Sequence, residues 1–315
     1  MKSAVINEFG PAVSLQIRDV PRPAPGPGQV LVEVHASSVN PIDWKIPGGQ
    51  MAARYGSTFP MILGFDASGV VVEVGADVTD FAPGDVVFAR SDVGAGGCYA
   101  EYAVLNTRTV ARKPKELSHA EAAAMPLAAL TALNGLRDPG HLKAGQRVLI
   151  IGASGGVGTY AVQIARNMGA HVTAVCSTAN LAFARELGAE HVIDYTHEPV
   201  LVAGANYDVI YDTVGAHNLT VARPALRDNG VYLTLVPVPG IEFFMPGQTQ
   251  RKAGSGYFLV WAPTAADLEI LAGWAREGRL MSVIDSEFRL DDISAAHARS
   301  KTLRARGKIV IRVKD

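Results

Sequence analysis

The stretch that most constrains the fold is residues 147–168, RVLIIGASGGVGTYAVQIARNM, which has the pattern of a strand, a glycine-rich turn and a helix. Its first five residues are mostly aliphatic, as in strands buried in a parallel sheet. Apolar residues then recur at helical spacing after the turn. A glycine backbone lets a diphosphate approach closely, and the free N–H groups at a helix start favour its charge. The stretch therefore predicts a dinucleotide site, whose turn carries Gly152, Gly155, Gly156 and Gly158.

Composition and charge exclude several classes of protein. The 315 residues are 48% hydrophobic and 19% charged, which is ordinary for a soluble α/β protein with room for two domains. A net charge of −1 gives no reason to expect nucleic acid or an anionic membrane as a partner. No apolar run reaches the roughly 18–20 residues of a membrane span, and residues 1–10 lack a signal-peptide pattern. With Cys98 and Cys176 alone there is no disulfide framework or four-cysteine metal site. We expect a cytoplasmic protein.

The first part of the chain has the sequence pattern of a small β domain. Short apolar or alternating runs at residues 30–39, 69–75, 85–89 and 99–105 are separated by proline- and glycine-rich segments, which predicts closely spaced strands of a barrel-like domain. From Ser118 the sequence becomes rich in alanine and leucine and predicts a helix that begins with a Ser-x-x-Glu capping box.

The rest of the chain alternates strands and helices. Predicted strands at residues 171–176, 191–195, 207–215 and 230–238 follow the glycine turn, which is typical of a parallel sheet with crossover helices. After two further helices the chain closes with a strand, GKIVIRVKD, which we expect to return to the first domain.

The second strand of the dinucleotide fold bears on the choice of cofactor. An acid at its end accepts from the ribose 2′-hydroxyl of NAD(H) and repels a 2′-phosphate. Here the strand at 171–176 is followed by Ser177, Thr178, Ala179 and Asn180, with no acid, so NADPH is favoured over NADH. Alternatively, Ser177 and Thr178 cap the next helix. No lysine or arginine follows closely to neutralise a phosphate.

Two alternative chemistries can be weighed from the residues. Short-chain reductases need a tyrosine with a lysine four residues later, and no tyrosine after the glycine turn has one. Eight histidines and two cysteines include no spacing that closes a tetrahedral zinc site.

Several motifs occur in order along almost the whole chain: PGPGQVLVEVHASSVNPIDWK, GFDASGVVVEVG, FAPGDVVF, YAEY, AAAMPLAALTAL, GASGGVG, DTVG and ARGKIVI. With these motifs the chain resembles the zinc-independent, quinone oxidoreductase-like and enone reductase branch of the medium-chain dehydrogenase/reductase superfamily. That resemblance implies a GroES-like β-barrel domain formed by both termini, residues 1–118 and 263–315, with a Rossmann NADP(H)-binding domain of doubly wound parallel sheet inserted at 119–262.

Departures from the zinc-dependent cousins bear on the chemistry. Asn40 stands where they carry a catalytic cysteine, and Phe65 where they carry the histidine of Gly-His-Glu. Without a Lewis acid an alkoxide has little stabilisation. We therefore expect no metal, and hydride transfer to a quinone or an α,β-unsaturated carbonyl.

The resemblance also implies residue roles. Asn40 is expected to face the nicotinamide and donate to the acceptor carbonyl, with Asp43 and Lys45 on the same loop. Lys45 is expected near the nicotinamide ribose and substrate, although it also fits a solvated surface lysine. Tyr55 is a candidate for the pocket wall, and either it or Lys45 is the candidate proton donor. The expected cofactor contacts are Thr131, Gly155, Gly156, Val157, Ser177, Thr178, Asn180, Tyr195, Val214, Gly215, Leu235, Val236, Phe258, Val260 and Lys308.

Some of these residues have ordinary alternatives: Thr131 as a helix threonine and Lys308 as a strand-edge lysine. Two further functions also stay open: an NADPH-binding protein with a structural or sensing role and little turnover, and a zinc-dependent alcohol dehydrogenase. Resemblance to the family further implies a homodimer acting on a small-molecule substrate.

Overall fold

The computed structural model describes residues 1–315 apart from 11–14, 239–240, 245–255, 260–263 and 315. The chain forms two compact units, which we call unit 1 (Met1–Leu130 with Pro263–Asp315) and unit 2 (Thr131–Ala262). Unit 1 thus includes residues 119–130, which the predicted domains at 1–118 and 119–262 assigned to the second domain. The reason is helix α3 (His119–Ala124), which packs against strands β3 (Gln29–Val39) and β5 (Asp66–Val74) of unit 1.

Unit 1 is a largely antiparallel β structure. One sheet has the order β2-β1-β4, and the other has the order β16-β17-β3-β5-β6-β8, with β7 also paired to β3. The alternating runs in the sequence account for these strands, because their apolar residues form two buried clusters in this unit. The remaining strands are β1 (Lys2–Ile6), β2 (Gln16–Asp19), β4 (Met61–Ile62), β6 (Val86–Arg90), β7 (Tyr102–Asn106), β8 (Val110–Arg112), β16 (Ile284–Arg289) and β17 (Lys308–Arg312).

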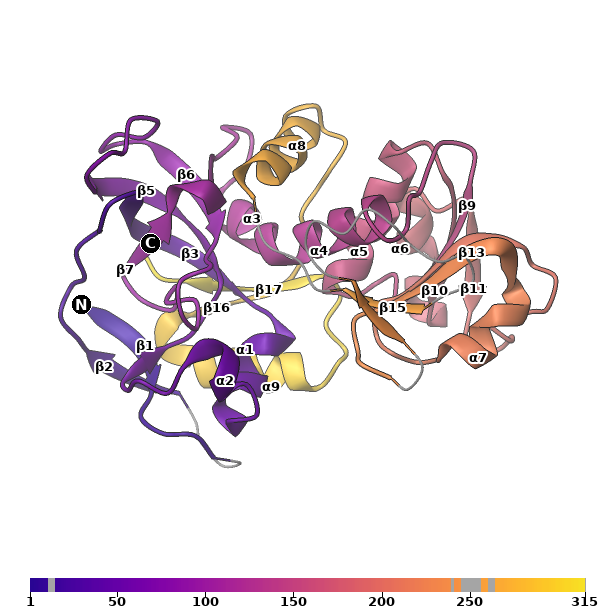
Figure 1. Ribbon diagram of the computed structural model, residues 1–315, viewed down its shortest axis with the longest axis horizontal. Coiled ribbons are helices and arrows are strands. Elements are labelled where there is room, and N and C mark those ends of the chain that lie inside the picture. Colours follow the sequence, from indigo (N-terminus) through magenta and orange to yellow (C-terminus); the bar gives the residue numbers. More distant parts are fainter. Residues whose placement is uncertain (11–14, 239–240, 245–255, 260–263, 315) are drawn as a thin grey trace. The chain divides into compact units, whose positions relative to one another are not determined.

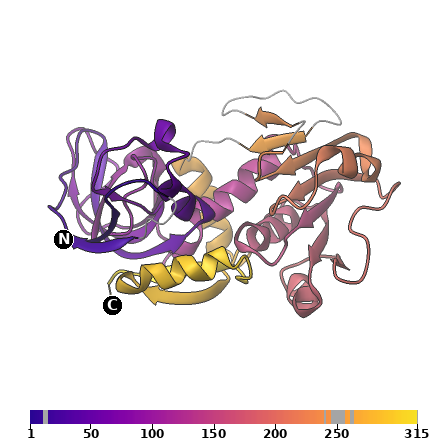
Figure 2. The same cartoon turned by 90° about the horizontal axis from the view of Figure 1, so that it is seen from below.

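The last strand returns to the first unit, as the sequence predicted. Strand β17 pairs antiparallel with β3, with Ile309 opposite Val39. This register brings Lys308 beside Asn40, the residue that follows β3. Helix α9 (Ile293–Lys301) packs along β16 and β17, and both chain ends lie in this unit (Figures 1 and 2). The other helices of unit 1 are α1 (Pro41–Lys45), α2 (Ala52–Tyr55) and α8 (Ala265–Arg276).

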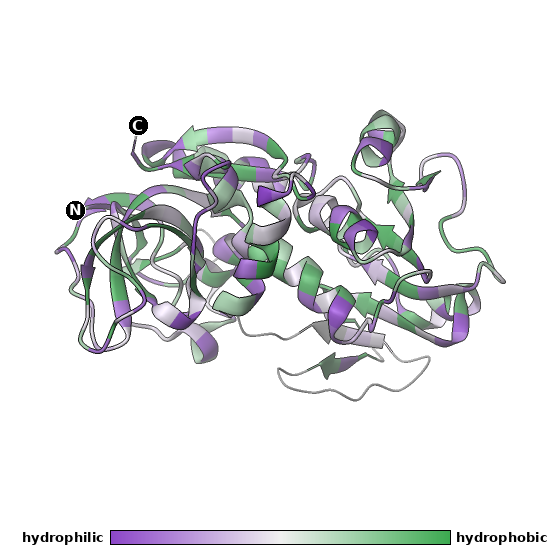
Figure 3. Ribbon diagram, turned by 90° about the horizontal axis from the view of Figure 1, so that it is seen from above, coloured by the Kyte–Doolittle hydropathy of each residue, from purple (hydrophilic) through white to green (hydrophobic). Residues whose placement is uncertain are grey.

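Unit 2 contains a sheet with the order β11-β10-β9-β12-β13-β15-β14, and the neighbouring strands that the structure describes in it are parallel. Hydrophobic residues lie along its strands (Figure 3). The sequence thus predicted the fold class correctly. The strands are β9 (Arg147–Ile151), β10 (His171–Cys176), β11 (His191–Asp194), β12 (Tyr207–Asp212), β13 (Leu226–Thr234), β14 (Glu242–Phe244) and β15 (Gly256–Leu259). The helices are α5 (Gly156–Asn167), α6 (Leu181–Glu186) and α7 (Leu219–Ala222).

The helical stretch after Ser118 consists of two helices. Ser118 and Glu121 form the predicted capping box at the start of α3. The chain then begins a second helix, α4 (Pro126–Arg137), with Pro126 at its first position, because proline lacks the N–H that would continue α3. In the part of the chain that the structure describes, no helix is long and apolar enough to cross a membrane.

Candidate functional site

The glycine turn opens helix α5 at the carboxyl end of β9. Gly152 has a positive φ of 81°, and Gly155 is the N-cap, so the helix begins at Gly156. No acidic residue lies in its first turn. The first amide groups of a helix lack acceptors within it and carry the positive end of its dipole. This helix start is therefore free of a competing side-chain anion.

The glycines of this turn differ in whether the protein has room for a Cβ at their position. A Cβ on Gly158 would lie 2.1 Å from the carbonyl oxygen of Gly152, and a Cβ on Gly152 would lie 2.7 Å from Thr213 Oγ1. The protein's own packing therefore requires both glycines. A Cβ on Gly155 would meet one atom, the Gly152 oxygen at 3.4 Å, which is ordinary contact. Space above Gly155 is thus left open by the protein, which fits a cradle for a closely approaching diphosphate.

Most of the expected cofactor residues lie at one edge of the parallel sheet. The carboxyl ends of neighbouring parallel strands meet at the same edge, and ligands of such sheets bind there. The segments that leave this edge are 152–158 after β9, 177–180 after β10, 195–198 after β11, 213–215 after β12 and 235–236 after β13. Gly155, Gly156, Val157, Ser177, Thr178, Asn180, Tyr195, Val214, Gly215, Leu235 and Val236 all belong to these segments.

The other expected contacts are not in these segments, and Lys308, which belongs to unit 1, is described below. Thr131 is in helix α4, buried, with its carbonyl oxygen accepting a 2.9 Å hydrogen bond from Tyr211 Oη. Phe258 is in strand β15, and Val260 lies outside the described residues.

Asp212 organises the loop after β12, and the sequence analysis missed it. Its Oδ1 accepts hydrogen bonds from the N–H groups of Val214 (3.1 Å) and Gly215 (2.8 Å). Its Oδ2 accepts from the His217 N–H and from Tyr232 Oη, both at 2.9 Å. These bonds turn the chain away from the sheet, which explains why β12 ends at 212 and not at 215. The signal in the sequence is an acid directly after a buried strand.

A second carboxylate, Asp194, holds the segments after β10 and β11 together. Oδ2 accepts from Thr178 Oγ1 at 2.5 Å and lies 3.0 Å from His197 Nδ1, while Oδ1 accepts from Thr196 Oγ1 at 2.6 Å. These hydrogen bonds, that of Thr178 first, hold the pKa of the Asp194 carboxyl well below its usual range. We call Asp194, Thr178, Thr196 and His197 the edge cluster.

The edge cluster changes the expected role of Thr178. Its hydroxyl donates to Asp194 and is not left for a phosphate. Ser177 starts a short 3-10 helix, η3 (Thr178–Asn180), without a side-chain capping bond, and its hydroxyl accepts from Asn180 Nδ2 at 3.2 Å. The alternative that these side chains cap a helix is therefore wrong for this segment.

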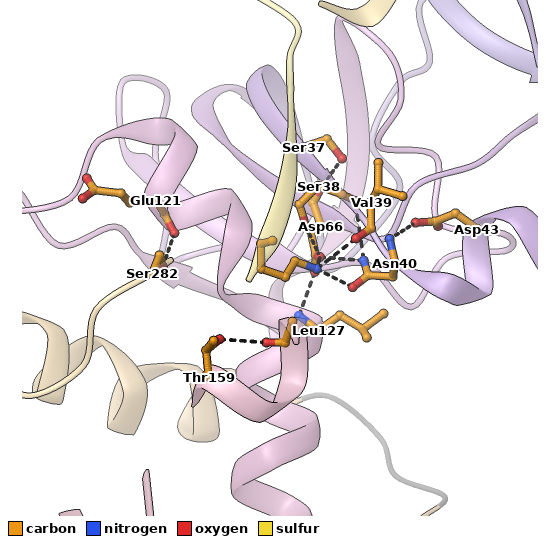
Figure 4. Close-up of polar contacts among 12 residues, drawn as sticks. Ser37, Ser38, Val39, Asn40, Asp43, Asp66, Glu121, Leu127, Thr159 and Ser282 are labelled. Atoms are coloured by element: carbon orange, nitrogen blue, oxygen red, sulfur yellow. Dashed lines mark hydrogen bonds and ion pairs between the residues drawn. The ribbon is translucent and has the colours of Figure 1, made fainter. Parts of the chain in front are cut away.

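A buried polar cluster lies in unit 1, where strands β3, β5 and β17 end beside helix α4 (Figure 4). Asp66 Oδ2 accepts from Ser38 Oγ (2.6 Å) and Asn40 Nδ2 (2.8 Å), and its Oδ1 accepts from the Leu127 N–H (2.7 Å). Lys308 Nζ donates to Asn40 Oδ1 at 2.5 Å and to the Val39 carbonyl at 3.1 Å, and lies 3.7 Å from Asp66 Oδ2. We call Ser38, Asn40, Asp66 and Lys308 the core cluster.

The core cluster corrects two expectations. Both ends of the Asn40 amide are bonded within unit 1 and the residue is 2% exposed, so its amide does not present a free donor to an acceptor carbonyl. Lys308 is 3% exposed, with three oxygen partners for its three N–H bonds, and it is neither a pyrophosphate ligand nor a strand-edge lysine. The sequence missed this because the neighbours of Lys308 depend on the pairing of β17 with β3.

Asp43 lies next to this cluster as part of a capping box at the start of α1. Its Oδ2 accepts from the Asn40 N–H at 2.7 Å and from Tyr99 Oη at 2.8 Å. Oδ1 is buried with no hydrogen-bond partner. Burial raises the pKa of the Asp43 carboxyl to about 7. Asp43 is therefore a buried group of unit 1 that carries a proton over part of the neutral range.

Two expected residues keep accessible side chains. Lys45, at the end of α1, is exposed, with Nζ 5.5 Å from the centre of the Trp44 ring. Tyr55 is partly buried, and its ring centre lies 5.5 Å from that of Phe65. The guanidinium of Arg90 lies 5.0 Å from the same Phe65 ring, and the sequence analysis did not single it out.

The side chains around Asn40 and Phe65 indicate whether this region could bind a metal ion. Among the described residues, no three histidine, cysteine, aspartate or glutamate side chains are grouped as a metal site would require. Asn40 Oδ1 and Asp66 Oδ2 are each already beside the Lys308 ammonium. A second cation there would meet that positive charge at close range.

Comparison with known proteins identifies the family. Residues 26–115 match a family described as "Alcohol dehydrogenase GroES-like domain", and residues 187–311 match one described as "Zinc-binding dehydrogenase". The chain is 37% identical to the "Chloroplast envelope quinone oxidoreductase homolog" of Arabidopsis thaliana, covering 96% of this chain and 95% of that protein. The human "NAD(P)H oxidoreductase RTN4IP1, mitochondrial" is 37% identical over 91% of this chain and 82% of its own.

Two further comparisons agree. The "2-methylene-furan-3-one reductase" of Solanum lycopersicum is 34% identical over 90% of this chain and 71% of its own. The solved structure of the quinone oxidoreductase from Coxiella burnetii matches with a TM-score of 0.85 and 31% identity, covering 100% of this chain and 99% of that one. The fold is that of a medium-chain dehydrogenase/reductase, an oxidoreductase superfamily. Within it, the chain belongs to the zinc-independent quinone oxidoreductase branch.

Proposed function

We propose that this protein is an NADPH-dependent, zinc-independent reductase of quinones or α,β-unsaturated carbonyls. The observation that carries the proposal is the open cradle at Gly155, where a helix start without an acidic residue meets space that the protein does not fill. The relatives named as quinone oxidoreductase, NAD(P)H oxidoreductase and 2-methylene-furan-3-one reductase support a nicotinamide cofactor and these two acceptor classes.

Unit 2 would hold the cofactor at the carboxyl edge of its sheet. The N–H groups of Gly156 and Val157 would donate to the diphosphate, as free helix-start amides do. Asp212 keeps the Val214–Gly215 turn beside the glycine turn, since Gly152 packs against Thr213 and Val214. When bound, the reduced nicotinamide supplies a hydride; the residues of unit 2 bind and orient it.

Unit 1 would supply the groups that orient the acceptor. The core cluster fixes the end of β3 and the start of α1, and so fixes the position of Lys45. Lys45 Nζ and Tyr55 Oη are the accessible donors for a carbonyl oxygen of the acceptor, and one of them, or water, delivers the balancing proton. Holding a donor in place for a developing negative charge is the main demand of such a reaction.

The chemistry of the same cluster supports zinc independence. The Lys308 ammonium donates to Asn40 Oδ1 and to the Val39 carbonyl and forms an ion pair with Asp66. A Lewis acid would have to displace this buried cation, and Phe65 offers no ligand atom. Activated acceptors such as quinones and enones have less need of one than an alcohol does.

The first experiment is NADPH oxidation with a panel of quinones and enones, repeated with NADH. We expect turnover with at least one acceptor and a higher kcat/KM for NADPH. Tight NADPH binding without turnover on any acceptor would instead favour a structural or sensing role. Stoichiometric zinc in the purified, active protein would contradict zinc independence.

A pair of glycine variants tests the cradle itself. Gly155→Ala should fold normally and weaken NADPH binding by about tenfold or more, because hydrogen bonds to charged groups contribute about 1.5–3 kcal/mol. Gly158→Ala is the matched control for packing: its Cβ would clash with the Gly152 oxygen, so it should lower the unfolding free energy by about 1–3 kcal/mol. A Gly155→Ala variant that binds NADPH normally would remove the main support for the proposal.

Lys45→Gln and Tyr55→Phe distinguish the two candidate donors. The variant that loses the true donor should lower kcat with little change in NADPH affinity, whereas a pocket-wall role alters KM for the acceptor. The homodimer and the cytoplasmic location stay predictions; relatives are named as chloroplast and mitochondrial proteins.

A further inference from the structure

The proposed NADPH site lacks an obvious cation for the adenosine 2′-phosphate. Residues 171–200, which form β10, α6, β11 and the segments after them, include one arginine and no lysine. That residue, Arg185, is in the last turn of α6. Since α6 connects the carboxyl end of β10 to the start of β11, its last turn points away from the ligand edge of the sheet. These segments therefore bring no lysine or arginine of their own to the ligand edge, and another kind of side chain is the local candidate for the positive charge.

His197 lies at that edge with its ring held in place. Its Nδ1 is 2.8 Å from Thr196 Oγ1 and 3.0 Å from Asp194 Oδ2, and the side chain is 72% exposed. The hydrogen bonds and the ion pair of the ring within the edge cluster all use Nδ1, so Nε2 is directed away from the cluster. Such a ring is fixed on the protein side and open on the other.

The neighbours of His197 are the residues expected to meet the adenosine ribose. Thr178 Oγ1 lies 3.5 Å from His197 Nδ1 and bonds the same Asp194 oxygen, so the segments after β10 and β11 are joined at this point. Ser177 and Asn180, which bond each other, belong to the first of these segments. Strand β10 also pairs with β9, whose following turn is the proposed diphosphate cradle. In dinucleotide folds the ribose that carries the 2′ group lies at the end of this second strand.

Asp194 does not act as the acid that selects NADH. Its side chain is 10% exposed, and both oxygens accept hydrogen bonds from the edge cluster. A carboxylate occupied in this way is not available to a ribose 2′-hydroxyl. It lies 3.0 Å from His197 Nδ1 instead, where it holds the ring in place.

We propose that His197, as an imidazolium held by Asp194, is the cation that recognises the 2′-phosphate and, with Ser177, makes this protein prefer NADPH over NADH. This assignment rests on the proposed dinucleotide site of unit 2. It places the preference in the segment after the third strand of the sheet, where the sequence offers no lysine or arginine.

The test measures binding of two nucleotide fragments that need no acceptor and no turnover, 2′,5′-ADP and 5′-AMP, by calorimetry. The wild-type protein should bind 2′,5′-ADP more tightly. His197→Gln should weaken 2′,5′-ADP binding by about tenfold and leave 5′-AMP unchanged, as expected for the loss of one charge-assisted hydrogen bond. The matched variant His197→Lys keeps a positive charge and should retain the preference.

Different outcomes overturn different claims. If the wild type binds neither fragment, nor NADPH or NADH, the proposed function fails together with this assignment. If the wild type prefers 2′,5′-ADP and His197→Gln keeps the full preference, the assignment of His197 alone is wrong. The kcat/KM ratio of NADPH to NADH in the three proteins gives a second readout and should follow the same order. Equal unfolding curves for the three would exclude misfolding as the cause, since the side chain is exposed.

Discussion

The core cluster of unit 1 and the edge cluster of unit 2 are built alike and exposed differently. Each centres on a carboxylate that accepts from a hydroxyl and a backbone N–H and lies beside a basic side chain. In the core cluster the side chains of Asp66 and Lys308 are 0% and 3% exposed; in the edge cluster those of Asp194 and His197 are 10% and 72% exposed. The same group of interactions is therefore buried as a scaffold in one place and holds an exposed ring in the other, which is the ring that we propose binds the 2′-phosphate.

The largest expected effect comes from breaking the buried ion pair. Lys308→Met leaves the Asp66 carboxylate buried without its cation, which should lower the free energy of unfolding by about 3–5 kcal/mol. Urea denaturation measures this. Lys2→Met is the matched control in the same unit, because the Lys2–Asp291 pair is 45% and 49% exposed and should contribute about 1 kcal/mol or less. Equal losses in the two variants would show that burial does not distinguish these pairs.

The second effect is a pH dependence that Asp43 gives to the buried region. Burial raises its pKa to about 7 in the folded protein, so between about pH 4 and 7 the folded state keeps a proton that the unfolded state has released. Stability from this group therefore falls as pH rises through that window, by about 2–4 kcal/mol. Asp43→Asn should remove this slope in unfolding free energies measured from pH 4 to 8. An unchanged slope would mean that Asp43 is ionised in the folded state.

His297 should give a smaller dependence of the opposite sign. It is 7% exposed, its ring lies 5.7 Å from that of Tyr99, and burial lowers its pKa to about 4. Below about pH 6.5 the His297 imidazole is protonated in the unfolded chain but stays neutral in the folded protein until about pH 4. Stability is thus lost as pH falls from about 6.5 to 4, by about 2–3 kcal/mol. His297→Gln should remove this contribution, so that its unfolding free energy relative to the wild type rises as pH falls from about 6.5 to 4 and stays unchanged above about pH 7.

The edge cluster should respond least. Thr196→Val removes one hydroxyl hydrogen bond to Asp194 and should lower the unfolding free energy by about 1 kcal/mol. His197→Gln, in an exposed pair, should change it by about 0.5 kcal/mol or less. Both variants can be compared in urea at pH 7. A loss as large as that of Lys308→Met in either would remove the contrast between the two clusters.

Local patterns predicted most of the fold because strands and helices are specified by nearby residues. The alternating runs of unit 1, the strand–helix series of unit 2 and the Ser118–Glu121 capping box are all present in the structure. The predicted domain boundary after 118 differs from the division into compact units, because only packing shows that α3 contacts strands of unit 1.

The candidate site was harder to predict, since its contacts join distant residues. Lys308 and Asn40 are 268 positions apart, and nothing near either in the sequence reveals the other. The role of His197 depends on the pairing of β10 with β11, although Asp194 is only three residues away. The spacing of the glycines does not show which of them is needed for packing. That depends on what a Cβ would meet: the Gly152 oxygen at 2.1 Å for Gly158, but only at 3.4 Å for Gly155.

The position of β17 inside its sheet has a consequence for biosynthesis. This strand lies between β16 and β3, so residues 1–130 emerge from the ribosome before the strand that pairs with the end of β3 has been made. Until residue 308 is made, the carboxylate of Asp66 has no lysine beside it. Unit 2, whose strands all lie between residues 147 and 259, can close first. The first part of the chain to be synthesised is thus the last to be completed.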